Sequence, residues 1–145
     1  MRMAAGIALS TAAALAIAGS VRAQTIVDMK GTWSTTGQAV VQNGGAHHPT
    51  NEPGEIVGEY RLREVEFTYR IDGQDGARFW GSLTSRYRTE RLMGSIAADG
   101  KRVYMVDQDG FIDGVFIDPD TLDVCYREIK PASAVVSCNI VRRDK

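Results

Sequence analysis

From Lys30 onward the chain consists of short runs in which apolar and polar residues alternate, separated by Gly, Asp, Asn and Pro. Alternation with a period of two is typical of β-strands that bury one face. The runs lie at residues 31–41, 56–62, 65–71, 77–85, 91–96, 102–107, 111–117, 122–129 and 134–143. We therefore expect eight or nine strands and no helix after residue 23.

The alternation changes phase once within the first half of the chain. Ile56, Tyr60 and Leu62 occupy even positions, whereas the apolar residues of the run 65–71 occupy odd positions. A change of phase moves the apolar side chains to the other face of a sheet. It predicts a bulge or a bend near Arg63-Glu64 that separates two strands.

The connections between the runs are short and join neighbours in the sequence. Asp72–Gly76 and Asp99-Gly100 carry the Asp-Gly signals of hairpin turns, and Lys130–Ser133 forms the last turn. Sequential hairpins favour an up-and-down meander, and a meander of eight strands can close on itself and remove its exposed edges. We expect an all-β fold, a small closed antiparallel barrel of about eight strands, with an open sandwich as the alternative.

The N-terminus has the features of a secretory signal peptide. Arg2 precedes an apolar run from Ala4 to Gly19, and Val21-Arg22-Ala23 provides a cleavage site after Ala23. The alternative is an uncleaved membrane anchor, but the run is shorter than the ~20 residues that a spanning helix needs. We expect a signal peptide at 1–23, a single β-barrel domain at 24–145, and a periplasmic or secreted location.

The charge balance of the predicted mature chain excludes one class of partner. The sequence contains 17 Lys and Arg against 18 Asp and Glu. Residues 1–23 include Arg2 and Arg22 and no acidic residue, so 15 basic residues remain against 18 acidic ones, a net charge of −3. Nucleic-acid-binding domains usually carry a basic face, so we expect no nucleic-acid partner. No segment after residue 23 is long and apolar enough to span a bilayer.

The chain contains two cysteines, Cys125 and Cys138. If Lys130–Ser133 is the turn, Ile129 faces Ala134 across the hairpin and the same register places Cys125 opposite Cys138. Directly opposed residues in a non-hydrogen-bonded pair lie close enough for a disulfide. Because disulfides persist in oxidising compartments, the pair agrees with the predicted export. We interpret it as a structural crosslink.

The two ends of the barrel sequence resemble the calycin superfamily, which includes lipocalins, fatty-acid-binding proteins and avidins. Gly31-Thr32-Trp33 begins the first predicted strand, and Arg142-Arg143 lies near the end of the last. In calycins a Gly-x-Trp opens the first strand, and an arginine of the last strand packs over the indole. The resemblance implies that Trp33 is buried beneath either Arg142 or Arg143, with Gly31 completing the motif.

Candidate chemistry is sparse. The sequence contains no nucleophile elbow, zinc-binding helix motif or glycine-rich phosphate loop. It identifies no catalytic residues, and the nearest candidates for acid–base work are the two histidines, His47 and His48. Adjacent side chains of an extended chain diverge, so this pair makes a poor metal chelate. We expect no metal and no cofactor.

The layout favours a binding module for an apolar or amphipathic small molecule, because an eight-stranded barrel can hold one small ligand. In the lipocalins the loop equivalent to Asn43–Glu55 covers the open mouth. Inward aromatic residues such as Tyr60 or Tyr69 are candidate ligand contacts, and Trp80 is a candidate contact if it faces outward. The alternatives are a barrel enzyme of the isomerase, lyase or decarboxylase type, and a packed barrel that binds or inhibits a protein partner. The interior of the barrel separates the three functions. A cavity favours the binding module, a buried polar pair of perturbed pKa favours the enzyme, and a solid core favours the protein-binding barrel.

Overall fold

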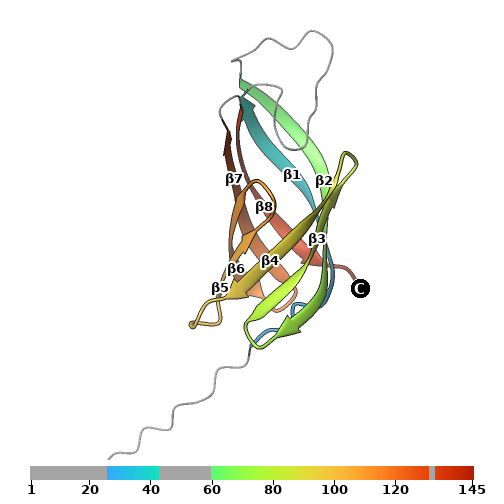
Figure 1. Ribbon diagram of the computed structural model, residues 1–145, viewed down its shortest axis with the longest axis vertical. Helices are drawn as coiled ribbons and strands as arrows, with labels where there is room; N and C mark the ends of the chain where they lie inside the picture. The colour runs from blue at the N-terminus through green and yellow to red at the C-terminus, as the bar shows by residue number, and fades with distance from the viewer. Residues whose placement is uncertain (1–25, 43–59, 131–132) are drawn as a thin grey trace, which may run out of the picture.

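The computed structural model describes residues 26–42, 60–130 and 133–145. This part of the chain forms eight antiparallel strands and contains no helix. The strands are β1 (Gly31–Gln42), β2 (Tyr60–Asp75), β3 (Arg78–Ser85), β4 (Thr89–Ile96), β5 (Arg102–Val106), β6 (Phe111–Asp118), β7 (Thr121–Lys130) and β8 (Ser133–Arg143). Each strand pairs with the next, and β8 pairs with β1 (Figure 1). The predicted all-β, closed up-and-down barrel is therefore confirmed. With no helix among these residues, none offers a membrane-spanning helical segment.

The predicted break near Arg63-Glu64 is wrong. β2 is continuous, and its register with β1 is unbroken from Tyr60 to Ile71. The odd-numbered side chains of β2 face inward along this whole length, so Leu62 lies on the outer wall. The hydrophobic pattern reverses because the interior at this end of the barrel is not part of the apolar core, and Arg63 faces inward there. The irregularity of β2 lies between Ile71 and Gly73, where its register with β3 shifts.

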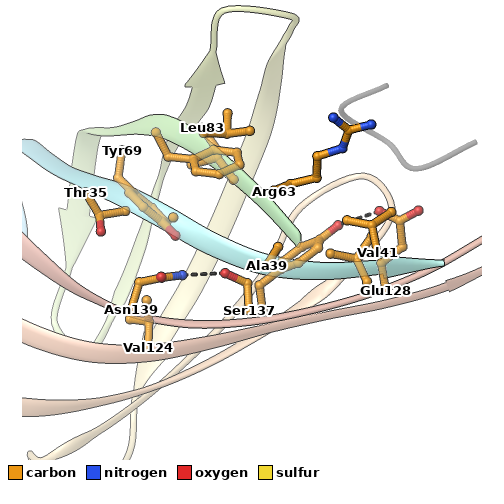
Figure 2. Close-up of a pocket in the computed structure, with 15 residues that line it drawn as sticks. Thr35, Ala39, Val41, Arg63, Tyr69, Leu83, Val124, Glu128, Ser137 and Asn139 are labelled. Carbon is orange, nitrogen blue, oxygen red and sulfur yellow. Dashed lines mark hydrogen bonds between the residues drawn. The ribbon is translucent and has the colours of Figure 1, made fainter. Parts of the chain in front are cut away.

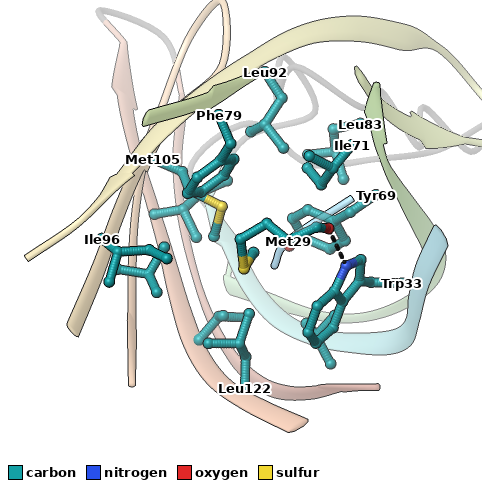
Figure 3. Close-up of a cluster of buried hydrophobic side chains, with 14 residues drawn as sticks. Met29, Trp33, Tyr69, Ile71, Phe79, Leu83, Leu92, Ile96, Met105 and Leu122 are labelled. Carbon is teal, nitrogen blue, oxygen red and sulfur yellow. Dashed lines mark hydrogen bonds between the residues drawn. The ribbon is translucent and has the colours of Figure 1, made fainter. Parts of the chain in front are cut away.

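Large apolar side chains fill the end of the barrel where β1 begins (Figure 3). The buried cluster consists of Met29, Trp33, Tyr69, Ile71, Phe79, Leu83, Leu92, Ile96, Val103, Met105, Ile112, Leu122, Val124 and Val141. The void that remains among these side chains measures about 10 Å³. A single water needs about 10–15 Å³, so this end of the barrel is solidly packed.

Arg143 closes the packed end. Its guanidinium carbon lies 4.1 Å from the centroid of the Trp33 ring. The same guanidinium donates hydrogen bonds to the carbonyl oxygens of Lys30, at 2.6 Å, and Asp28, at 2.5 Å. Arg142 lies opposite Ser34 and is exposed on the outer wall. Of the two arginines that the resemblance left open, Arg143 is the one that stacks on the indole.

The disulfide forms as the hairpin register predicts. Cys125 is the direct partner of Cys138, and their sulfur atoms are bonded. The Cα atoms lie 4.0 Å apart, in agreement with a closely spaced antiparallel pair. Both side chains lie on the outer wall, because the even-numbered residues of β7 and the odd-numbered residues of β8 face inward. A disulfide is typical of an oxidising environment. The predicted signal peptide at 1–23 lies outside the described residues.

Candidate functional site

The inward side chains of β1 and β8 are small at the end of the barrel opposite Trp33. From β1 they include Gly37, Ala39 and Val41, and from β8 they include Ser137 and Asn139 (Figure 2). Such residues leave space along one wall, whereas the other end of the same strands carries Trp33 and Val141. The change from small to large inward residues along β1 and β8 divides the interior into a hollow half and a packed half.

Larger side chains from the flanking strands β2 and β7, and from β3, complete the lining. The complete lining of the cavity is Thr35, Gly37, Ala39, Val41, Arg63, Val65, Phe67, Tyr69, Leu83, Val124, Tyr126, Glu128, Val135, Ser137 and Asn139. The Phe67 ring packs against Gly37, where an added Cβ would lie 2.9 Å from the ring. A glycine at position 37 therefore lets the aromatic side chain of the neighbouring strand β2 lie across β1.

The cavity has a volume of about 60 Å³ and a mainly apolar lining. This volume accommodates a few atoms, and it is smaller than the ~150 Å³ engineered cavity that binds benzene. A drug-sized ligand, which occupies ~300–1,000 Å³, would need the walls to move. Two hollows on the outer wall have mainly polar linings that include Glu66 and Asp123. The interior cavity is therefore the better candidate site for an apolar molecule.

Most polar groups of the lining already pair with one another. Ser137 donates a hydrogen bond to the backbone oxygen of Gln38 at 2.8 Å, and it accepts one from the amide of Asn139. The Asn139 oxygen accepts a hydrogen bond from the Gln38 backbone N–H at 2.7 Å. On the neighbouring strand β7, the Tyr126 hydroxyl donates to Glu128 at 2.8 Å. These bonds fix the walls and leave few polar groups for a ligand.

Three carboxylates gather beside the hollow half of the barrel. Glu90 of β4 is 2 % exposed, Glu128 of β7 is also buried, and Asp107 follows β5. The ammonium of Lys130 lies 3.1 Å from Glu128, and Arg88 lies 4.0 Å from Glu90. Asp107 accepts hydrogen bonds from the backbone of its own turn. In the described part of the chain, no group of three His, Cys, Asp or Glu residues is placed to hold a metal ion.

Burial raises the pKa of Glu90 to about 7, and the charge of Asp107 adds to this effect. Glu128 acts in the same direction, while Arg88 and Lys130 lower the pKa of Glu90. Burial and the same Asp107 charge also raise the pKa of Tyr126, so its phenol stays protonated as the donor to Glu128. Glu90 therefore titrates near neutral pH, although it is not part of the cavity lining.

We expect the free energy of unfolding to fall by about 1–3 kcal/mol as the pH rises from about 4.5 to about 7 because of Glu90. In this range the folded state keeps the Glu90 proton that the unfolded state has released, so a rising pH favours unfolding. Glu90→Gln should remove this slope and be more stable than wild type at pH 8. Urea unfolding at pH 5 and pH 8 measures both effects.

Glu66→Gln is the matched control, because Glu66 is exposed on the outer wall. It should leave the difference between the two pH values unchanged. Equal pH dependence of wild type and Glu90→Gln would contradict the burial of an ionisable Glu90.

Of the three aromatic residues named as ligand contacts, the structure brings one to the cavity. Tyr69 lines it and is 8 % exposed. Tyr60 is 76 % exposed and lies on the outer wall, because the even-numbered side chains of β2, such as Tyr60 and Leu62, face outward. His47 and His48 lie outside the described residues, as does the rest of the 43–55 loop.

Trp80 faces outward and is 51 % exposed. It pairs with Met93, Met93 pairs with Val106, and Val106 pairs with Phe111, so these side chains form an apolar row across β3 to β6 on the outer wall. Phe79, the residue before Trp80 in the sequence, is buried in the packed half. Trp80 is therefore remote from the interior cavity.

Sequence reasoning missed the carboxylates and the polar lining. A usable signal was available in the alternation: Glu90 shares the parity of the inward Leu92, and Glu128 shares that of Val124. An acidic residue in phase with the buried positions of a strand indicates an interior charge. Arg63 was missed because the sequence analysis placed it in a bend between two strands.

Comparisons with protein-family models, with curated proteins and with solved structures found no match to this chain. The site is therefore interpreted from its own geometry.

Proposed function

We propose that this protein is an exported, calycin-like binding module that holds a small apolar or amphipathic molecule in the hollow half of the barrel. The observation that carries the proposal is the division of the interior. One half is packed around Trp33, while the other half keeps an apolar cavity of about 60 Å³ between Ala39 and the aromatic residues of β2 and β7. A barrel that needed only stability would gain from filling this space, because cavities are destabilising.

The packed end supports the calycin part of the proposal. Gly31-x-Trp33 begins β1, and Arg143 of β8 stacks on the Trp33 ring, in a closed barrel of eight strands. This arrangement closes one end, so a ligand would enter from the end where β1 finishes and β2 begins. The disulfide in the last hairpin agrees with an oxidising compartment and hence with export.

One observation favours an enzyme as the alternative. Glu90 has a pKa of about 7, which suits a general acid or base at neutral pH. Because Glu90 does not line the cavity, a substrate held there would not contact it directly. This geometry favours binding over catalysis. The outer apolar row that includes Trp80 and Phe111 would instead serve a protein partner, as the third alternative requires.

Filling the cavity should weaken the binding of a small apolar probe. We expect methylenecyclopentane, whose six carbon atoms need the walls to move apart beyond the present volume of about 60 Å³, to bind the wild-type barrel and to shift the methyl resonances of Val65 and Val124, which line the cavity. Ala39→Leu should weaken this binding more than tenfold, because the larger side chain occupies the site. Two-dimensional NMR titration of the mature protein measures the dissociation constant and locates the probe.

Thr36→Leu is the matched control, since it adds a similar side chain to the outer face of β1. It should bind the probe with wild-type affinity. Equal binding by Ala39→Leu and wild type, or shifts confined to the outer wall, would overturn the proposed site.

A further inference from the structure

Tyr69 lies at the floor of the cavity. It lines both the cavity and the small void of the packed core, so its ring separates the two halves of the barrel. Figure 2 shows the side chain rising from β2 with its hydroxyl directed into the cavity. Although the residue is 8 % exposed, its hydroxyl has no hydrogen-bond partner among the described residues. The hydroxyl oxygen is not among the fully enclosed polar atoms of the described residues, so it is accessible from the cavity, where a ligand can meet it.

The surrounding polar groups do not supply that partner. Ser137 and Asn139 bond to each other and to the backbone of β1, and Tyr126 is bonded to Glu128. Thr35 is the other lining hydroxyl without a partner among the described residues, but it is only half-buried. Tyr69 is thus a hydroxyl donor that the protein itself leaves available to a ligand in an apolar site.

We infer that the ligand is a small neutral molecule whose acceptor oxygen, of the ketone, ester or ether class, receives a hydrogen bond from the Tyr69 hydroxyl. The apolar remainder of the molecule then lies against Ala39, Val65 and Val124. This inference rests on the proposed binding function and adds to it the chemistry of the ligand. Small-molecule sites commonly combine an apolar lining with one or two polar groups that fix orientation.

The charges around the floor favour a neutral ligand. Burial and the negative charge of Asp107 raise the pKa of Tyr69, so the phenol remains a donor at physiological pH. The same negative potential disfavours an anionic oxygen beside the phenol. Arg63, the cation of the lining, lies six positions away along β2, roughly 20 Å at the rise of a β-strand. An anionic group at the floor would therefore be buried without a counter-ion, and Asp107 does not line the cavity to pair with a cationic one, so burial of either charge is unfavourable.

The test compares two probes of nearly identical shape. Cyclopentanone carries an acceptor oxygen, and methylenecyclopentane has a carbon in its place. We expect wild type to bind the ketone about tenfold more tightly than the hydrocarbon, the effect of one buried hydrogen bond. Tyr69→Phe removes only the hydroxyl, so it should bind the two probes equally, through weaker binding of the ketone alone. Calorimetric or NMR titrations give the four dissociation constants.

Two further measurements separate this role from a structural one. Tyr69→Phe should melt at the same temperature as wild type or higher without ligand, because the hydroxyl has no partner to lose. Tyr104→Phe is the control, since Tyr104 lies on the outer wall of β5, and it should keep the ketone preference. Cyclopentanecarboxylate and cyclopentylammonium should bind at least tenfold more weakly than cyclopentanone.

The possible outcomes separate the role of Tyr69 from the proposed binding function. Equal affinity of wild type for ketone and hydrocarbon, or an unchanged preference in Tyr69→Phe, overturns the role of Tyr69 while the binding function stands. Tighter binding of either charged probe overturns the neutral class. If no probe binds inside the barrel, the proposed function fails, and the inference fails with it.

Discussion

Trp33→Ala is expected to lower the free energy of unfolding by about 3–5 kcal/mol in the absence of any ligand. The side chain is 1 % exposed and belongs to the packed half of the barrel. Its indole N–H donates a hydrogen bond to the Met29 carbonyl at 2.9 Å, and Arg143 covers its ring. Truncation would therefore open a cavity, leave a buried carbonyl without its donor and remove the stacking surface of the arginine.

Trp80→Ala is the natural control, because it removes the other tryptophan of the chain from the outer wall. It should cost about 1 kcal/mol or less, since surface substitutions have small effects. Urea unfolding followed by far-ultraviolet circular dichroism compares the two variants without relying on tryptophan fluorescence. Similar losses in both would contradict the assignment of Trp33 as the closing residue of the barrel.

Removing the Cys125–Cys138 disulfide is expected to lower the free energy of unfolding by about 2–3 kcal/mol. The bond joins residues 13 positions apart and so restricts the unfolded chain across the β7–β8 hairpin. Both cysteines lie on the outer wall, so replacing them with serine leaves no hole in the core. The cost should therefore come from the crosslink rather than from packing.

The double variant Cys125→Ser/Cys138→Ser and reduced wild type should have nearly the same urea midpoint, both below oxidised wild type. Adding a reductant to the double variant is the control and should change nothing. An oxidised wild type no more stable than its reduced form would show that the hairpin holds its register without the bond.

The sequence predicted those features that depend on local alternation and turn chemistry. Alternating runs bounded by Asp-Gly turns define the hairpins, and eight strands joined in sequence can close into a barrel that leaves no strand edge exposed. The Cys125–Cys138 pairing followed from one turn, since an antiparallel register is set once its hairpin loop is placed. The choice between Arg142 and Arg143, which the sequence left open, depends only on which side chains of β8 face inward. Val141 faces inward, so Arg143, two positions on, lies on the same face.

The features that sequence reasoning missed depend on contacts between distant strands. Tyr60 and Leu62 were taken as inward because they are apolar, yet they are outward because Arg63 and Val65 share the inward face of β2. The raised pKa of Glu90 depends on Asp107 and Glu128, which belong to other parts of the barrel. The size of the cavity depends on small residues of β1 and β8 facing aromatic residues of β2 and β7. No local pattern contains these combinations.

The most direct test of a hollow, ligand-accessible half is a crystal of the mature protein pressurised with xenon, which occupies apolar cavities. We expect one strong xenon peak inside the barrel, in contact with Ala39, Val65 and Val124, and no peak among the side chains around Trp33. The peak should disappear in Ala39→Leu. Absence of xenon from the wild-type interior, or a peak that persists unchanged in Ala39→Leu, would contradict the binding cavity on which the proposed function depends.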